Sequence, residues 1–94
     1  MEFDWDNTPF ELSGEINSQE IEESFEDPFA ARLLPDSPRF EGTARFFNLG
    51  RSANGNGFFS VYRTNGKQFR VLCSRLFEPE EMFFYKRRMK KLLD

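Results

Sequence analysis

The dipeptide Asn65-Gly66 constrains the fold more than any other feature, because strand-like segments flank it on both sides. FFSVYRT (58–64) and KQFRVLCS (67–74) are rich in the aromatic and β-branched residues that favour strands. Asn-Gly between two such segments is a strong signal for a two-residue hairpin turn. The pattern therefore predicts an antiparallel hairpin over residues 58–74.

Three further segments extend the predicted sheet. TARFFNLG (43–50) predicts another strand, joined to the hairpin by the Gly- and Asn-rich connection 51–57. MEFDW (1–5) alternates apolar and acidic residues, which indicates a short half-buried strand. FAARLLPDSPRFEG (29–42) is ambiguous, and residues 31–34 fit an edge strand followed by a loop. Together these segments predict an antiparallel meander.

Three segments predict helices. DNTPFELS (6–13) offers cap residues before an early Pro and predicts a short helix. NSQEIEESF (17–25) repeats this pattern, and Pro28 ends it because the residue before Pro is pushed out of the α region. EPEEMFFYKRRMKKLL (78–93) has acids in its first turn and bases in its last, as the helix dipole favours. We expect a single α+β domain over residues 1–94, with two N-terminal helices and one C-terminal helix.

The residue content excludes several classes of site. The chain has no His and a single cysteine, Cys73. A single cysteine excludes an internal disulfide, and the absence of His excludes His-based acid–base or nucleophilic catalysis and argues against zinc. The N-terminus lacks the features of a signal peptide, and no apolar run approaches the roughly 20 residues that span a bilayer. We therefore expect a cytoplasmic protein with no membrane association, metal or cofactor.

Charge is divided unevenly along the chain. Residues 1–38 hold eleven acidic groups and one basic group, for −10, whereas residues 39–94 hold twelve basic and five acidic groups, for +7. A basic surface of this kind can engage an anion such as RNA. Alternatively, the acidic and basic parts complement each other within the fold.

Arginines fall on three neighbouring predicted strands, where a sheet can gather them into one patch. Alternation along residues 67–74 points Arg70 away from the core. The same alternation places Cys73 on the core side with Phe69 and Val71. Arginine suits a phosphate site because its planar fork donates two hydrogen bonds to two phosphate oxygens. A solvated sheet face is the alternative role for these side chains. The four arginines are Arg45, Arg63, Arg70 and Arg75.

The C-terminal helix adds residues of two further kinds. Tyr85 is either a core ring with its hydroxyl at the rim, or a proton donor or base-stacking surface beside the arginines. Glu81, one turn earlier, is either solvated or a partner of Arg75. Further positive charge at Lys67, Arg87 and Arg88 would attract nucleic acid in a salt-sensitive way.

Four segments of the chain occur in an order and spacing that matches a known family. They are MEFDWD (1–6), INSQEIEESFEDP (16–28), ARFFNLGRSANG (44–55) and RVLCSRLFEPEEMFFY (70–85). Their succession resembles the BrnT toxins, small bacterial proteins of type II toxin–antitoxin systems with a RelE-like fold. The residues that fall on family motif positions are Phe25, Asp27, Pro28, Arg45, Gly50, Ser52, Arg70, Arg75, Glu81 and Tyr85.

The resemblance implies a RelE-like fold and a ribonuclease that blocks translation, with a BrnA-type antitoxin as partner. We expect metal-independent cleavage of RNA, in which Arg70 and Arg75 hold the scissile phosphate. Tyr85 would aid proton transfer or stack on a base, and Glu81 would orient an arginine. The expected RNA-binding residues are Arg45, Arg63, Lys67, Arg87 and Arg88.

The chain also departs from the family pattern. SGE (13–15) stands where the family usually has Lys-His-Gly, and Met82 stands where it has Arg after the helix Glu. Both departures remove a polar or basic group. They favour an alternative function, a catalytically weakened or inactive BrnT-like interaction protein that binds a protein partner or RNA without cleavage.

Overall fold

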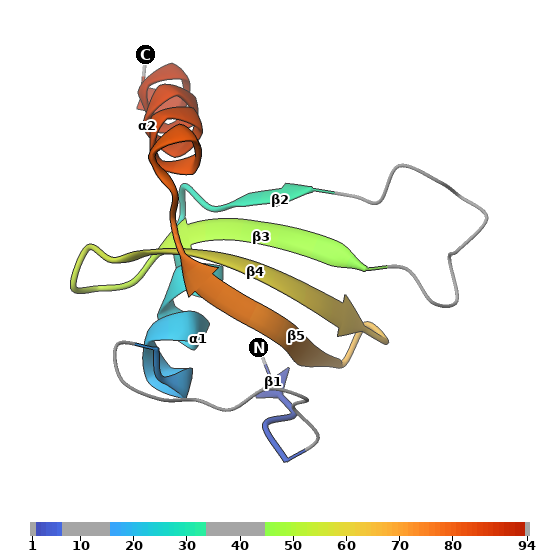
Figure 1. The fold of residues 1–94 in the computed structure, drawn as a ribbon. Coiled ribbons are helices and arrows are strands. Elements are labelled where there is room, and N and C mark those ends of the chain that lie inside the picture. Colours follow the sequence, from blue (N-terminus) through green and yellow to red (C-terminus); the bar gives the residue numbers. More distant parts are fainter. Residues whose placement is uncertain (1, 7–15, 34–44, 94) are drawn as a thin grey trace.

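Within the residues that the structure describes, a five-stranded sheet and two helices form the body of the fold (Figure 1). The structure is a computed structural model that describes residues 2–6, 16–33 and 45–93. The sheet order is β1-β5-β4-β3-β2, and every neighbouring pair is antiparallel except β1 with β5. The elements in chain order are β1 (Glu2–Phe3), α1 (Ser18–Glu26), β2 (Ala31–Leu33), β3 (Phe46–Arg51), β4 (Gly57–Thr64), β5 (Gln68–Leu76) and α2 (Pro79–Leu93).

The predicted fold class is wrong in its sheet, and the described residues hold a single helix before β2. The sheet is mixed rather than an antiparallel meander, because Phe3 of β1 pairs in parallel with Phe69 of β5. One helix, α1, precedes β2 in the described residues, and the other predicted N-terminal helix, 6–13, lies almost entirely outside them. The RelE-like arrangement of two N-terminal helices on an antiparallel sheet is therefore not what the structure shows. A strand of two residues carries no sequence signal for the direction in which it pairs.

The hairpin and α1 follow their local sequence signals. The β4–β5 connection turns at Gly66, which has a φ of 90°, and the Asn65 side chain accepts the backbone N–H groups of Lys67 and Gln68. At the start of α1, Asn17 accepts the Glu20 N–H at 2.8 Å, which is N-capping by a side chain. The predicted hairpin and second helix are confirmed, although the turn is longer than two residues.

A β-bulge in β5 reverses the expected facing of one residue. Val61 pairs with Cys73, and the next residue of β4, Tyr62, pairs with Val71. Leu72 is therefore the inserted residue, with no partner on β4. An inserted residue moves every later side chain of the strand to the other face. The prediction that Cys73 shares the core side with Val71 is therefore wrong, and Cys73 is exposed.

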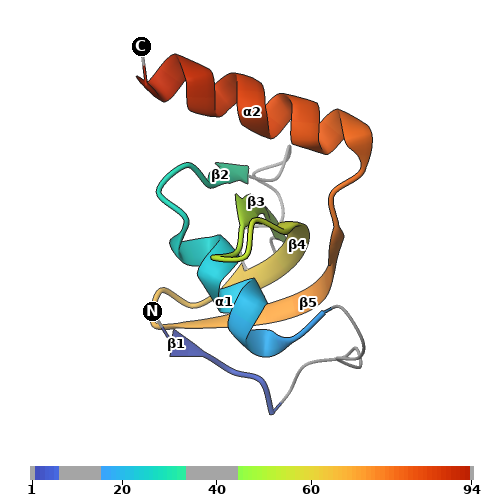
Figure 2. The same ribbon diagram turned by 90° about the vertical axis from the view of Figure 1, so that its left-hand side faces the viewer.

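α1 lies on the concave side of the sheet, whereas α2 runs past the edge of the sheet formed by β2 (Figure 2). The core under α1 is mainly aromatic, because the buried Phe25 ring meets Tyr62 edge-on at 5.0 Å and Phe3 at 5.2 Å. Gly50 of β3 lets the sheet approach α1 closely, since a Cβ there would lie 1.9 Å from the Ser24 carbonyl oxygen. Large rings give a small domain much buried apolar area from few residues.

Candidate nucleic-acid interface

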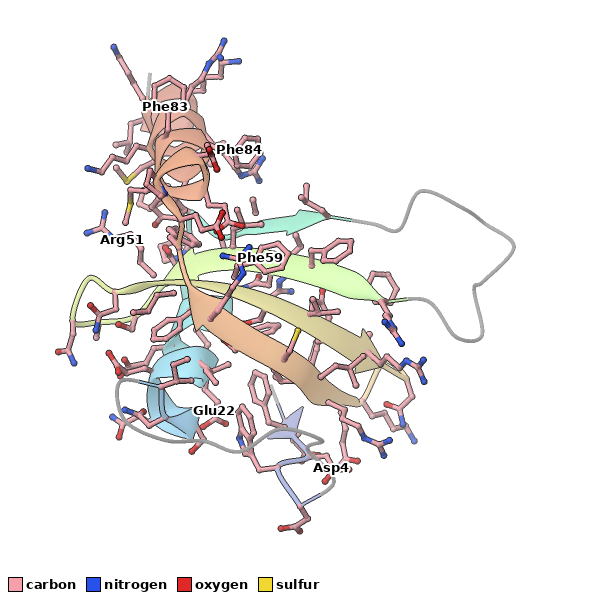
Figure 3. The ribbon with its side chains drawn as sticks, viewed as in Figure 1. Asp4, Glu22, Arg51, Phe59, Phe83 and Phe84 are labelled. Atoms are coloured by element: carbon pink, nitrogen blue, oxygen red, sulfur yellow. The ribbon has the colours of Figure 1, made fainter. Side chains whose placement is uncertain are left out.

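The sheet face turned away from α1, which we call the outer face, carries three of the predicted arginines. Register places them in cross-strand pairs on β4 and β5: Phe59 is opposite Arg75, and Arg63 is opposite Arg70. Between these pairs, Val61 is opposite Cys73. Figure 3 shows Phe59 on the sheet beside the segment that leads from β5 into α2. The outer face of these two strands consists of Phe59, Val61, Arg63, Arg70, Cys73 and Arg75.

The Arg75 guanidinium is held from two directions. Its Nη1 and Nη2 donate to the two carboxylate oxygens of Glu81 at 2.6 and 2.7 Å, a bidentate pair. Its Cζ lies 4.6 Å from the centroid of the Phe59 ring, within the range of a cation–π contact. The side chain is 45% exposed. Arg75 is therefore oriented by its neighbours while it remains open to solvent.

Glu81 is placed for this pair by the start of α2. Pro79 is the first helical residue, and the Glu81 carboxylate accepts the Glu78 N–H at 2.8 Å, as in the N-terminal half of a capping box. Arg75 lowers the pKa of the Glu81 carboxyl, and Glu81 raises the pKa of Arg75. Glu81, which we expected to orient an arginine, thus contacts Arg75 and stays ionised at neutral pH.

One edge of the Arg75 guanidinium stays open. Of its five N–H groups, two donate to Glu81 and a third reaches the Leu76 carbonyl oxygen at 3.2 Å. The other two, on Nε and Nη2, have no hydrogen-bond partner in the part of the chain that the structure describes. These two groups are adjacent and can donate to two oxygens of one phosphate.

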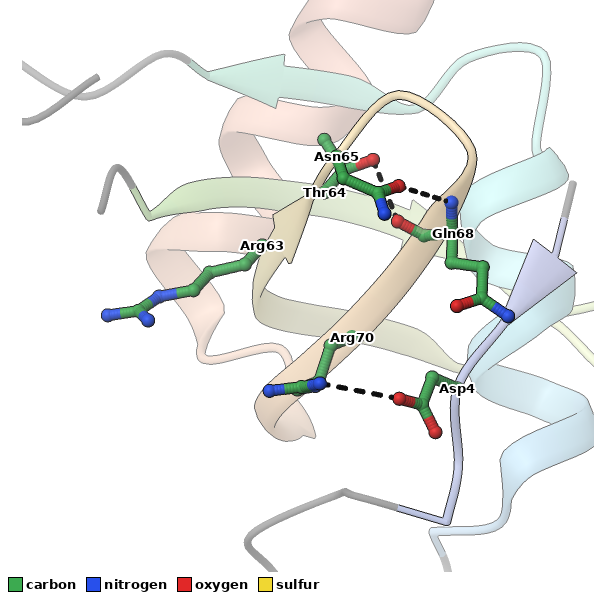
Figure 4. Close-up of a pocket in the computed structure, with 6 residues that line it drawn as sticks. All are labelled: Asp4, Arg63, Thr64, Asn65, Gln68 and Arg70. Carbon is green, nitrogen blue, oxygen red and sulfur yellow. Dashed lines mark hydrogen bonds and ion pairs between the residues drawn. The ribbon is translucent and has the colours of Figure 1, made fainter. Parts of the chain in front are cut away.

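Arg70 lies at the opposite end of β5 from Arg75. The two pair with Arg63 and Phe59, four positions apart on β4, which corresponds to roughly 13 Å at the rise of a strand. Arg70 forms an ion pair with Asp4 at 3.4 Å instead (Figure 4). The structure therefore does not bring Arg70 and Arg75 together on a single phosphate, contrary to our expectation.

Comparisons with known proteins give no further guidance to this site. No family model, curated protein or solved structure matches the chain. The described residues include no group of three His, Cys, Asp or Glu side chains that could hold a metal ion. The same residues form no helix with the length and apolar character needed to cross a bilayer. What the site can do must follow from its own contacts.

Tyr85, which we expected to aid proton transfer or to stack on a base, is buried instead. It is 2% exposed, and its hydroxyl donates to Oδ2 of Asp27 at 2.5 Å. Burial and the hydrogen bond to Asp27 raise the pKa of Tyr85 well above its usual value. On its other side, the Arg51 guanidinium lies 5.7 Å from the ring centroid. Tyr85 is therefore neither open for base stacking nor suited to release a proton near neutral pH.

Sequence reasoning gave no role to Asp27 or Phe59, although Asp27 falls on a family motif position. Besides Tyr85, the Asp27 carboxylate accepts the backbone N–H groups of Arg51 and Phe29 at 2.8 and 2.9 Å. It therefore joins the ends of α1 and β3 to α2. The Asp-Pro pair in the sequence predicted only a helix end, and no signal in the sequence pointed to the contact between Phe59 and Arg75.

The remaining predicted RNA-binding residues are exposed and dispersed. Arg45 precedes β3, and Lys67 lies in the β4–β5 turn. Arg87 and Arg88 belong to α2, where they line a shallow hollow of about 260 Å³ together with Phe84 and Lys91. Within the described residues, no contact joins these side chains across elements.

Proposed function

We propose that the chain is a cytoplasmic, BrnT-like ribonuclease toxin of a type II toxin–antitoxin system, which cleaves RNA at Arg75 and so inhibits translation. The observation that carries the proposal is the Arg75 guanidinium, oriented by Glu81 and Phe59 with two adjacent N–H groups open. The ordered BrnT-like motifs of the sequence support the same interpretation. A donor that is already oriented need not reorganise when charge develops on the phosphate.

The chemistry requires only positioning and charge stabilisation from the protein. The 2′-oxygen of RNA attacks the neighbouring phosphorus, and the bond from phosphorus to the 5′-oxygen breaks. The products are a 2′,3′-cyclic phosphate and a 5′-hydroxyl; the 2′-proton passes to water, and the leaving oxygen takes a proton from water. Arg75 stabilises the negative charge on the non-bridging oxygens. We assign no proton transfer to Glu81 or Tyr85, because both Glu81 carboxylate oxygens pair with Arg75, and Tyr85 is buried and donates to Asp27.

A protein partner of the BrnA antitoxin type belongs to this proposal. α2 exposes large apolar side chains, and Phe83 and Leu93 are 69% and 68% exposed. The last turns of the same helix carry basic residues. A partner with an apolar strip flanked by acidic residues would fit this surface.

Expression in a bacterium tests the proposal. The parent chain should arrest growth and translation, and Arg75→Ala should restore both. Lys90→Ala is a matched control, because nine residues place Lys90 half a turn away from Glu81 on α2. The proposal fails if the parent has no effect, or if Arg75→Ala arrests growth as strongly as Lys90→Ala at equal expression.

RNA binding without cleavage is the second candidate function. The separation of Arg70 from Arg75 and the burial of Tyr85 favour it, because they leave one oriented arginine where two arginines and an acid were expected. A gel-shift experiment in which the RNA is retarded and recovered intact would support this candidate against the toxin.

A further inference from the structure

Arg63 and Arg70 form a like-charged cross-strand pair at one end of the outer face. Directly opposed residues have Cβ atoms about 4.5–5.5 Å apart, and like charges at that spacing destabilise a sheet. Asp4 offsets one of the two charges through its ion pair with Arg70, while Arg63 has no ion pair within the described residues. The cluster keeps a net positive charge, and Lys67 in the adjacent turn adds another.

The surroundings of this pair form a hollow of about 200 Å³ at the end of the hairpin. Figure 4 shows the side chains of Arg63 and Arg70 extending to the same side, with Asp4 on the other side of Arg70. Two oxygens of the turn are already used, since the Thr64 hydroxyl donates to the Gln68 carbonyl oxygen and accepts the Gly66 N–H, and the Asn65 side-chain oxygen accepts two backbone N–H groups. The two guanidinium groups are the positively charged donors that line the hollow, and they can bind an anion.

We propose that Arg63 and Arg70 form a second phosphate-binding subsite, and that one RNA strand lies across the outer face from Arg75 to this pair. The inference rests on the proposed function, because it takes RNA to be the ligand at Arg75. From Phe59 to Arg63 the path along β4 is about 13 Å at the rise of a strand. The small, uncharged side chains of Val61 and Cys73 lie between Arg75 and the Arg63–Arg70 pair, so the RNA can pass over them.

This arrangement has two consequences that catalysis at Arg75 alone does not have. An RNA with a single phosphate can occupy only one subsite at a time, so only a longer RNA can contact Arg75 and the Arg63–Arg70 pair together. Cys73 should be covered by the bound strand. It is exposed in the free protein and is the single cysteine of the chain, so its alkylation reports on this position alone.

The test compares the parent, Arg63→Ala and Lys90→Ala with a ten-nucleotide 2′-O-methyl RNA, which lacks the attacking hydroxyl, and with a dinucleotide. Arg63→Ala should weaken binding of the decamer more than binding of the dinucleotide, because only the decamer can contact both subsites at once. Loss of one phosphate contact should reduce the salt dependence of decamer binding, as the slope of log K against log salt, by about 0.7. Saturating decamer should slow alkylation of Cys73 by iodoacetamide in the parent.

The results separate the two proposals. An unchanged salt slope in Arg63→Ala, or alkylation of Cys73 at the same rate with and without decamer, would overturn the inference even if the parent cleaves RNA. Protection of Cys73 with the expected slope change would support the inference even if the parent cleaves nothing. Absence of decamer binding by the parent would overturn the inference and contradict RNA as the ligand. Circular dichroism of Arg63→Ala checks that the exposed substitution leaves the fold intact.

Discussion

The hydroxyl of Tyr85 in α2 donates to the carboxylate of Asp27, 58 residues earlier in the chain, at 2.5 Å. Because Asp27 also accepts the Arg51 N–H, this contact fixes α2 to the ends of α1 and β3. Glu81 lies one helical turn before Tyr85 and pairs with Arg75. Because Glu81 and Tyr85 belong to the same helix, the buried Tyr85–Asp27 hydrogen bond indirectly positions the Arg75 guanidinium on the outer face.

Replacement of Tyr85 by Phe should reduce stability rather than abolish function. It removes a donor from a carboxylate, and hydrogen bonds to charged groups contribute about 1.5–3 kcal/mol. Urea unfolding at pH 7 measures the loss, with Tyr62→Phe as control, because no hydrogen bond of the buried Tyr62 is found among the described residues. Normal stability combined with lost RNA cleavage in Tyr85→Phe would instead show a catalytic role.

Stability should also fall at high pH because of Tyr85. Its pKa is raised in the folded protein, whereas a tyrosine in the unfolded chain titrates near 10. As the pH rises, Tyr85 therefore loses its hydroxyl proton first in the unfolded chain. Its contribution to the free energy of unfolding is complete below about pH 10 and is lost as the pH rises further. The free energy of unfolding should decrease more steeply in the parent than in Tyr85→Phe above pH 10. Parallel curves for the two proteins would contradict this.

Glu20 should make stability sensitive to acid. Its carboxylate accepts hydrogen bonds from Asn56 and Ser52 at 2.9 and 3.1 Å, which ties α1 to the β3–β4 connection. These donors, Asn56 first, lower the pKa of Glu20. The contribution of the ionised Glu20 carboxylate to the free energy of unfolding is therefore present above the pKa of about 4.3 in the unfolded chain, and it is lost as the pH falls below that value.

Urea unfolding between pH 6 and pH 3 measures this effect. The parent should lose stability more steeply than Glu20→Gln over that interval. Glu22→Gln, on the same helix (Figure 3), is the control, because no hydrogen bond of Glu22 is found in the described residues. Steepness that is equal in Glu20→Gln and Glu22→Gln would show that Glu20 is not the group responsible.

Gly50→Ala should be among the most damaging small substitutions. The added methyl group would meet the Ser24 carbonyl oxygen, so β3 and α1 would have to separate. Overpacking of this kind costs about 3 kcal/mol or more when backbone must move. Thermal unfolding measures the change, and a loss of less than about 1 kcal/mol would mean that α1 can shift easily.

Glu81→Gln should separate RNA binding from RNA cleavage. Removal of the carboxylate charge leaves Arg75 unneutralised, so binding of RNA at low salt should be retained or strengthened. Cleavage should fall by about 10- to 100-fold, because the guanidinium loses its fixed orientation. Glu80→Gln makes the same change of charge at an exposed neighbour and should preserve cleavage. Equal cleavage by both variants would remove Glu81 from its positioning role.

The parts of the fold that could be predicted are those with local signals. The β4–β5 hairpin, α1 with its Asn17 cap and α2 with its charge pattern follow from neighbouring residues. The parallel pairing of β1 and the extra residue Leu72 depend on contacts between distant segments. That bulge alone moves Cys73 from the expected core side to the outer face.

The candidate site likewise contains one feature that local sequence could suggest and others that depend on contacts between distant segments. The Arg75–Glu81 pair spans one strand-to-helix turn, so the sequence could suggest it. The Tyr85–Asp27 hydrogen bond and the roughly 13 Å between Arg70 and Arg75 could not be predicted, because they depend on how α2 packs and on where each arginine falls along β5.

The most direct test of the central claim is the rate at which the purified protein cleaves total bacterial RNA at low salt. The parent and Lys90→Ala should both produce fragments with 2′,3′-cyclic phosphate ends. Arg75→Ala should be slower by about 100-fold or more, as expected for the loss of one preorganised donor. Intact RNA with the parent, or equal cleavage by Arg75→Ala, would contradict the account and leave Arg75 as a solvated residue of the sheet.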